Sequence, residues 1–359
     1  MSEFQYYEFY AIDKELTRQE REQVDKLSSR FSPTSRRAIF TYSYSDFRHN
    51  EESVLLKYFD FFLYLSNWGT KRVMYKFPQE IVNYDEIKQY KSSFENEYVD
   101  NGILIYKKSK FVIVDINLSK EEGDFWVEEE NNWSADLMGL RQNILDGDYR
   151  ALFIIWLHIK NLEYDYETID LDTKISKQLI PDNLNQLNSN LNRLIEFYEV
   201  NKDWITGAAK YSAKSSTTSK NYNQQIKNLP VDKKDEYLLR ILEGELNLNI
   251  KLKKELDKIG GKQQKQSTEK ITLRQLLNSI NDAEDKRRQI EKKEEEVRQL
   301  NRLKDIEKNK SAILKEIKHH VERGTGKSYD EALERIIRLR DLAKHKNEEL
   351  KFNRWINKL

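Results

Sequence analysis

Apolar and polar side chains alternate with a period of two at several places in the first third of the chain. Residues 6–12 put Tyr7, Phe9 and Ala11 on one face. This spacing is typical of a β-strand that buries one side. By the same reasoning, further strands are expected at 38–44, 72–77, 102–106 and 111–117. The last two lie close enough in sequence to form a hairpin around residues 107–110.

Helical patterns separate these strands. Thr17 and Glu20 have the spacing of a capping box, which predicts a helix to about Ser29. Residues 51–66 have the length and the apolar content of a core helix. The resulting order, β-α-β-α-β-β-β, predicts an α+β head domain over residues 1–165, with helices on one face of a mostly antiparallel sheet.

More helices are expected up to residue 206. Ser134 can cap a helix that runs to Leu145, and Asp148 can cap another. The second helix contains LFIIWLHI (152–159), which is apolar nearly all round and should therefore be buried. A further helix is expected at 185–199, so that residues 166–206 form a helical extension of the head.

The composition changes at 207–221, GAAKYSAKSSTTSKN, which is rich in small, polar and lysine residues. This segment is predicted to be a flexible linker and a domain boundary. Residues 222–359 then have helical patterns nearly throughout, and a long helix is expected from about Leu273. A thin heptad seam follows it, formed by Leu276, Ala283, Ile290 and Val297. The prediction is an all-α, partly coiled-coil-like basic arm that ends in an αα-hairpin.

Residues 324–328, GTGKS, resemble the end of a phosphate-binding loop. Such a loop needs a glycine five positions before Gly326, between a strand and a helix, but Val321 stands there and the preceding segment has a helical pattern. Gly324 can instead end one helix, and Ser328 can cap the next with Glu331 as its capping-box partner. The sequence therefore predicts the turn of a helical hairpin, no nucleotide binding and no cofactor.

The composition narrows the chemistry further. The chain has no cysteine, which excludes disulfides, thiolate nucleophiles and cysteine-ligated zinc. The N-terminus has no signal-peptide pattern. The longest apolar run, residues 151–157, is far shorter than the roughly 20 residues of a membrane-spanning helix. The sequence thus predicts a soluble, cytoplasmic protein without membrane association.

The near-neutral net charge of +1 conceals an asymmetry. Residues 1–200 hold 24 Lys and Arg and 35 Asp and Glu, a balance of −11. Residues 201–359 hold 38 and 26, a balance of +12. Either the two halves attract each other, or the basic half meets an acidic partner.

Two charged segments are candidate sites. The acidic loop at 124–130 offers carboxylates that suit magnesium or calcium, but its spacing does not match an EF-hand, and a contact surface for a partner is the alternative. The basic runs within 286–293 offer contacts to phosphate, yet glutamates alternate with them at helical spacing, as on a solvated helix face. The residues expected to contact a partner are Trp126, Trp133, Glu128, Glu129, Arg287, Arg288, Lys292 and Lys293.

Four blocks of the sequence resemble an uncharacterised bacterial protein family. They are YYEFYAID at 6–13, YFDFFLYLSNWGTKRVM at 58–74, TLRQLLNSIND at 272–282 and YDEALERIIRLRDLA at 329–343. The resemblance touches both ends of the chain in the family's order. It implies a bacterial, cytoplasmic setting and supplies no catalytic residue.

These observations favour a non-enzymatic protein-interaction, scaffold or adaptor protein of a bacterial cytoplasmic system. Its partner, or a second copy of the chain, would bind through helices within 222–359. Nucleic-acid binding through the basic arm is the first alternative. A divalent-metal-dependent enzyme with its site at 124–130 is the second.

Overall fold

A computed structural model describes residues 4–28, 33–43, 45–95, 100–119, 133–214, 222–259 and 269–359. The chain divides into two compact units, Met1–Ala283 and Glu284–Leu359. The observed division thus differs from the one expected at 207–221. It falls inside a continuous helix, α11 (Leu273–Lys308).

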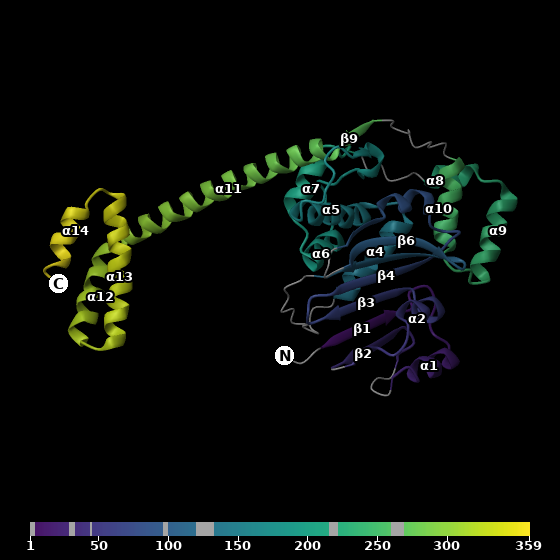
Figure 1. The fold of residues 1–359 in the computed structure, drawn as a ribbon, viewed down its shortest axis with the longest axis horizontal. Helices are drawn as coiled ribbons and strands as arrows, with labels where there is room; N and C mark the ends of the chain where they lie inside the picture. The colour runs from purple at the N-terminus through teal and green to yellow at the C-terminus, as the bar shows by residue number, and fades with distance from the viewer. Residues whose placement is uncertain are drawn as a thin grey trace. The chain divides into compact units, whose positions relative to one another are not determined.

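The first unit is built on a seven-stranded sheet in the order β2-β1-β3-β4-β7-β6-β5 (Figure 1). All neighbouring strands pair antiparallel, which confirms the predicted α+β fold. The expected hairpin is formed by β6 and β7. The strands are β1 (Gln5–Tyr10), β2 (Arg37–Tyr42), β3 (Phe61–Ser66), β4 (Lys71–Pro78), β5 (Ser92–Glu95), β6 (Asp100–Lys108) and β7 (Phe111–Leu118).

The single helix predicted at 51–66 is wrong in its second half. Helix α2 (Glu51–Tyr58) ends where Phe59 adopts an extended conformation, with φ −128° and ψ 172°. The following residues form β3, which pairs with β1 on one side and β4 on the other. A central strand that is buried on both faces carries apolar residues without alternation, so its sequence has no period of two.

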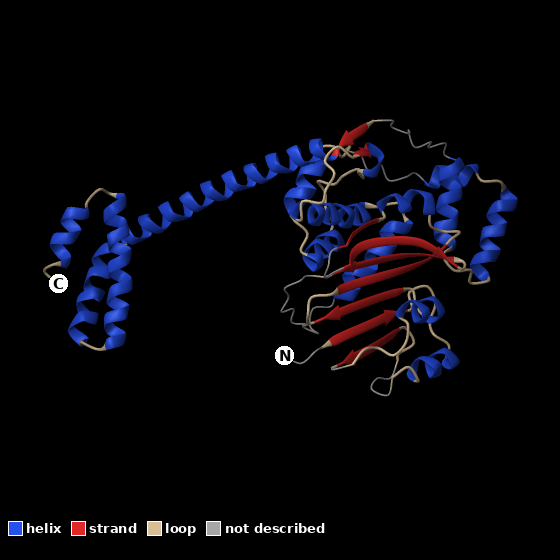
Figure 2. Ribbon diagram, viewed as in Figure 1, coloured by secondary structure: helices blue, strands red, loops and turns tan. Residues whose placement is uncertain are grey.

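Helices cover both faces of the sheet rather than the one face predicted (Figure 2). On one face, Phe9, Phe62 and Met74 pack with side chains of α1 (Arg18–Asp25) and α2. On the other, Phe61, Val73 and their neighbours pack against the helices that follow the sheet. These helices are α4 (Trp133–Leu145), α5 (Arg150–Asp165), α6 (Ser189–Tyr198) and α7 (Lys202–Ala209). The helix predicted to be buried, α5, lies in this core.

Residues far along the chain complete this unit. Strand β9 (Lys270–Thr272) pairs antiparallel with β8 (Lys174–Ser176), and the first turns of α11 bury Leu276 and Ile280 in the main core. Gly207 lies against them. A β-carbon at Gly207 would come within 2.6 Å of the Ile280 Cα. The start of the predicted linker is therefore a close helix–helix contact.

Short elements complete the first unit. Helices α3 and η1 follow β4, η2 follows β8, and three helices lie between α7 and β9. The bounds are α3 (Tyr84–Ile87), η1 (Lys88–Tyr90), η2 (Lys177–Leu179), α8 (Tyr222–Asn228), α9 (Val231–Leu242) and α10 (Leu248–Ile259). Within the described ranges, no helix combines the length and the apolar character that crossing a bilayer requires.

The second unit is helical. Ile306 of α11 packs with Ile317, Leu339 and Leu342 in a small apolar core, with Trp355 against it. The helices after α11 are α12 (Lys310–Arg323), α13 (Gly326–His345) and α14 (Glu349–Ile356).

The GTGKS segment is the turn of the predicted helical hairpin. Gly324 ends α12 in the left-handed conformation, with φ 63°, as expected. The residue that caps α13 is Thr325, whose side chain accepts a hydrogen bond from the backbone N–H of Ser328. The prediction that Ser328 is the cap is wrong, because α13 begins at Gly326, three residues earlier than predicted, and Ser328 lies buried in its first turn.

Candidate functional site

Only one of the residues expected in the acidic contact surface is described. Trp126, Glu128 and Glu129 lie outside the described residues, as does the rest of the loop at 124–130. Trp133 begins α4 and is buried, with the Arg193 guanidinium 4.0 Å from its ring centre. Its ring also lies 5.2 Å from that of Phe197. Trp133 is therefore a core residue and not a surface contact.

The four basic candidates all lie on α11 and are exposed. Arg287 pairs with Glu291 at 2.8 Å, and Arg288 pairs with Glu284 at 2.5 Å, both at i,i+4 spacing. Such pairs stabilise a solvated helix by about 0.2–0.5 kcal/mol each. Lys292 and Lys293 are exposed on the same helix. The pairing reduces the positive charge that this surface offers to phosphate.

The most pronounced apolar surface lies elsewhere, on α9 of the first unit. Four apolar residues of its second half, and one at its start, are largely exposed. A sixth lies just beyond its end. They are Val231 (68% exposed), Leu238 (59%), Leu239 (59%), Ile241 (60%), Leu242 (83%) and Leu246 (48%). Most leucines and isoleucines of the unit are buried, so this exposed apolar surface makes α9 the candidate interaction site.

This apolar surface, here named the α9 face, is held outward because the opposite side of α9 is fixed. Tyr237 is buried and donates a hydrogen bond from its hydroxyl to Glu255 of α10. Helix α10 is itself anchored, since Ile250 belongs to the main core. Figure 1 shows α8, α9 and α10 side by side at one end of the unit.

Ion pairs fasten these helices to the head. Lys251 of α10 lies 2.9 Å from Glu80, which follows β4, and Lys253 lies 2.8 Å from Asp146, which follows α4. In the turn between α9 and α10, Glu245 accepts hydrogen bonds from Arg240 at 2.5 Å and from Lys251 at 2.8 Å. The α9 face therefore has a defined position on the first unit.

The contacts of Glu245 predict a pH dependence. The hydrogen bond from Arg240, and then that from Lys251, lowers the pKa of Glu245 from 4.5 to about 2. Folding favours the charged form of this carboxylate, so its contribution to stability is complete above pH 4.5 and is lost as the pH falls towards about 2.

We expect Glu245→Gln to be less stable than the native chain at pH 6 to 7, with the difference shrinking steadily between about pH 5 and pH 2. Thermal unfolding at a series of pH values measures this. A difference that stays constant over the whole range would show that Glu245 is not held by Arg240 and Lys251.

Acidic residues border the α9 face on one side. Asp235, Leu239 and Glu243 follow Asp232 by three, seven and eleven residues. At helical spacing these four side chains therefore lie along one line of the helix. All three carboxylates are exposed, and none forms an ion pair with another described residue. The α9 face thus combines apolar side chains with three carboxylates that have no ion pair among the described residues, and its other side carries Lys234, which donates to the carbonyl of Lys227.

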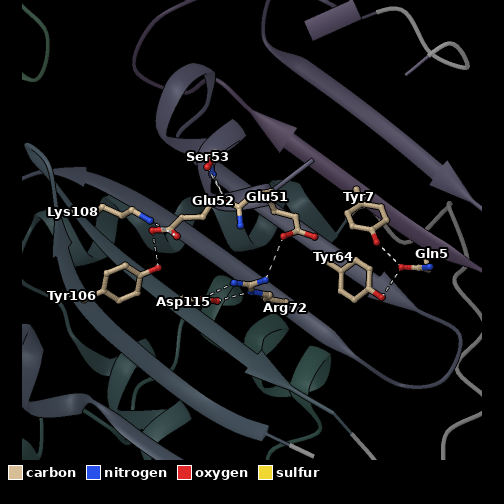
Figure 3. Close-up of polar contacts among 11 residues, drawn as sticks. Gln5, Tyr7, Glu51, Glu52, Ser53, Tyr64, Arg72, Tyr106, Lys108 and Asp115 are labelled. Carbon is tan, nitrogen blue, oxygen red and sulfur yellow. Dashed lines mark hydrogen bonds and ion pairs between the residues drawn. The ribbon is translucent and has the colours of Figure 1, made fainter. Parts of the chain in front are cut away.

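A second polar cluster joins α2 to the sheet (Figure 3). Arg72 donates to both oxygens of Asp115, at 2.9 and 2.8 Å, and lies 3.9 Å from Glu51. Glu52 accepts from Lys108 at 2.7 Å and from Tyr106 at 3.1 Å. Each charge in this cluster has an opposite charge beside it. We therefore assign the cluster to holding the N-terminal end of α2 on the sheet.

The described part of the chain contains no group of three or more His, Asp or Glu side chains that could hold a metal ion. Comparisons with models of known families, with curated proteins and with solved structures find no match for the chain. The resemblance to an uncharacterised bacterial family therefore stays a prediction from the four sequence blocks.

Proposed function

We propose that this chain is a non-enzymatic adaptor of the bacterial cytoplasm that docks an amphipathic helix of a partner protein on the α9 face. The observation that carries the proposal is the exposure of Leu238, Leu239, Ile241 and Leu242 on a single anchored helix. An amphipathic helix covers such a surface with apolar residues at i, i+3, i+4 and i+7. The bacterial and cytoplasmic setting comes from the sequence resemblance.

The acidic border determines the chemistry of the partner. Asp232, Asp235 and Glu243 would face residues that flank the apolar stripe of the docked helix. Lysine or arginine at those flanking positions would be attracted, whereas glutamate would be repelled. The occupant we infer is therefore a basic amphipathic helix.

A pair of synthetic peptides tests this proposal. One has leucines at helical spacing with lysine at the remaining positions, and the other has the same leucines with glutamate replacing every lysine. We expect the full-length chain to bind the lysine peptide in a fluorescence anisotropy titration and to bind the glutamate peptide much more weakly. Leu238→Gln/Leu242→Gln should weaken lysine-peptide binding by about tenfold or more, because two leucines lose their burial against the peptide.

Matched controls distinguish docking on the α9 face from nonspecific hydrophobic binding. Ile290→Gln/Val297→Gln removes two apolar side chains of similar exposure, 56% each, from α11 and should leave binding unchanged. Asp232→Asn/Asp235→Asn should reduce the preference for lysine over glutamate. Equal binding of both peptides, or no loss in the Leu238/Leu242 variant, would refute the proposal.

A second copy of the chain is the competing occupant. If the α9 helices of two copies packed antiparallel, the acidic residues of one copy would lie against those of the other. Their repulsion costs electrostatic energy. Sedimentation velocity should therefore show that substitutions on the α9 face do not change the oligomeric state. A dimer that dissociates in Leu238→Gln/Leu242→Gln would assign the face to self-association instead.

Nucleic-acid binding through α11 has weaker support, since Arg287 and Arg288 are engaged by glutamates of their own helix. The metal-dependent alternative rests on residues 124–130, which lie outside the described ranges.

A further inference from the structure

A pocket of about 630 Å3 lies in the first unit, beside the C-terminal end of α2. Its walls come from the segment between β1 and α1, from α2, from the loop after β4, from the start of β7 and from the turn between α9 and α10. Apolar side chains in these walls include Leu16, Leu56, Tyr58, Phe111 and Leu246. The pocket is thus large enough for a small organic molecule with an apolar body.

The floor of the pocket is an ion-paired network. Lys76 is buried, and its ammonium lies 3.2 Å from Asp60. It also donates to the carbonyl oxygens of Leu55 and Leu56, at 3.2 and 3.4 Å, at the C-terminal end of α2. The other oxygen of Asp60 accepts from two backbone N–H groups, at 2.8 and 2.9 Å. Asp60 is therefore fully engaged.

The remaining acidic residues of the pocket also have partners. Asp13 accepts two hydrogen bonds from Arg141, at 2.8 and 2.7 Å. At the rim, Glu15 pairs with Arg36 at 3.1 Å and Glu80 with Lys251 at 2.9 Å. Glu20 accepts from the backbone N–H of Thr17 at 2.7 Å, as part of the capping box of α1.

Three lysines of the pocket lack the ion pairs that hold most of its other charged side chains in the described part of the chain. Lys14, Lys57 and Lys110 line it, are exposed, and form no ion pair with any described residue. The ammonium of Lys57 lies 4.8 Å from the ring centre of Tyr58, and that of Lys110 lies 5.6 Å from that of Phe111. Among the described residues, Asp13, Glu15, Asp60 and Glu80 each pair with a cation, whereas Glu20 accepts from a backbone N–H and is attracted to Lys14. Three lysines therefore face one uncompensated carboxylate, and the charge left to meet a ligand is positive.

From this charge distribution we infer that the pocket binds a small organic anion with an aromatic or aliphatic body. The lysines supply flexible ammonium donors for a phosphate, sulfonate or carboxylate group. Leu16, Leu56 and Leu246 contact the apolar part. Leu246 also belongs to the segment that carries the α9 face, but the anion site rests on its own residues and not on the docking proposal.

The test uses naphthyl phosphate as the probe and naphthylmethylamine as a cation with the same ring system. Isothermal titration calorimetry on the full chain should detect binding of the phosphate and not of the amine. Lys57→Gln/Lys110→Gln should weaken phosphate binding by about tenfold or more, as expected when charge-assisted hydrogen bonds are removed. Both lysines are exposed, so circular dichroism should show an unchanged fold.

A matched control comes from the same hairpin. Lys107 lies on β6 with its ammonium 4.5 Å from the ring centre of Tyr84, and it does not line the pocket. Lys107→Gln should leave binding unchanged, as should Leu238→Gln/Leu242→Gln on the α9 face. Equal binding of the phosphate and the amine, no detectable phosphate binding, or an equal loss in Lys107→Gln would overturn the inference.

Discussion

Gly207→Ala should lower the free energy of unfolding of the first unit by about 2–3 kcal/mol, the cost of forcing an atom into a packed core. The added β-carbon would lie 2.6 Å from both the Cα and the Cγ1 of Ile280, and 2.7 Å from its backbone nitrogen. A flexible side chain could move away, but a helix backbone cannot do so cheaply. The shift would also disturb the hydrogen bond of 3.0 Å from Ser279 to the carbonyl of Gly207.

Urea unfolding monitored by tryptophan fluorescence measures this effect, since Trp204 lies on the same helix as Gly207. The control is Gly326→Ala at the start of α13, where an added β-carbon meets no atom within 4 Å. Alanine is the better helix former by about 1 kcal/mol, so this variant should be neutral or slightly more stable. Equal stability of Gly207→Ala and the native chain would show that α7 and α11 do not approach this closely.

Arg141→Met should lower the free energy of unfolding by about 3–5 kcal/mol, the range found when one partner of a buried ion pair is removed. The side chain of Arg141 is only 3% exposed, and that of its partner Asp13 is 12% exposed. Its guanidinium also donates to the carbonyl of Lys76 at 3.1 Å and lies 5.3 Å from the ring centre of Phe77. Methionine fills much of the volume of the arginine side chain. The lost stability therefore comes mainly from the Asp13 carboxylate, which is left without its counterion.

A double-mutant cycle identifies the cause. Arg141→Met/Asp13→Asn should cost clearly less than the sum of the two single variants, because the second change removes the unpaired charge. Arg288→Met is the exposed control. The Arg288 side chain is 67% exposed in its ion pair with Glu284. Removing this pair should therefore lower the free energy of unfolding by less than about 1 kcal/mol. If the stability losses of the two single variants add up to that of the double variant, Arg141 stabilises the unit through packing and not through its charge.

The sequence predicted the parts of the sheet whose strands bury one face. Alternation at 6–12 and 38–44 corresponds to β1 and β2, and the hairpin of β6 and β7 was expected from two apolar runs joined by a short polar turn. Strand β3 was missed because a doubly buried strand has the same apolar content as a buried helix. Only its pairing with β1 and β4 separates the two cases, and that pairing is not visible in a local window.

The small, polar composition of 207–221 predicts a linker. Small residues serve two opposite purposes, since they loosen a free chain and also permit two helices to approach closely. Gly207 serves the second purpose, because it is buried against Ile280 at the start of α11, and Ala208 beside it is buried in the same core. Composition alone does not distinguish these uses, since the partner helix lies about 70 residues away in sequence.

The candidate sites show a similar limit. The helical patterns throughout 222–359 include the residues of α9, but periodicity does not reveal which side of a helix another element covers. Tyr237 is buried and Leu238 is exposed, although they are neighbours and both are large. The three lysines of the pocket are also separated in sequence, so only the fold brings Lys14, Lys57 and Lys110 together.

The pairing of β8 with β9 has a consequence for biosynthesis. Lys174–Ser176 meets its partner strand only after Lys270–Thr272 has been made, nearly a hundred residues later. Until those residues leave the ribosome, the nascent head keeps part of its apolar surface open to water. Closing such a long loop is slow and entropically costly. Completion of the first unit is therefore a late event in translation, and a chain that stops near residue 206 lacks the segment that seals its own core.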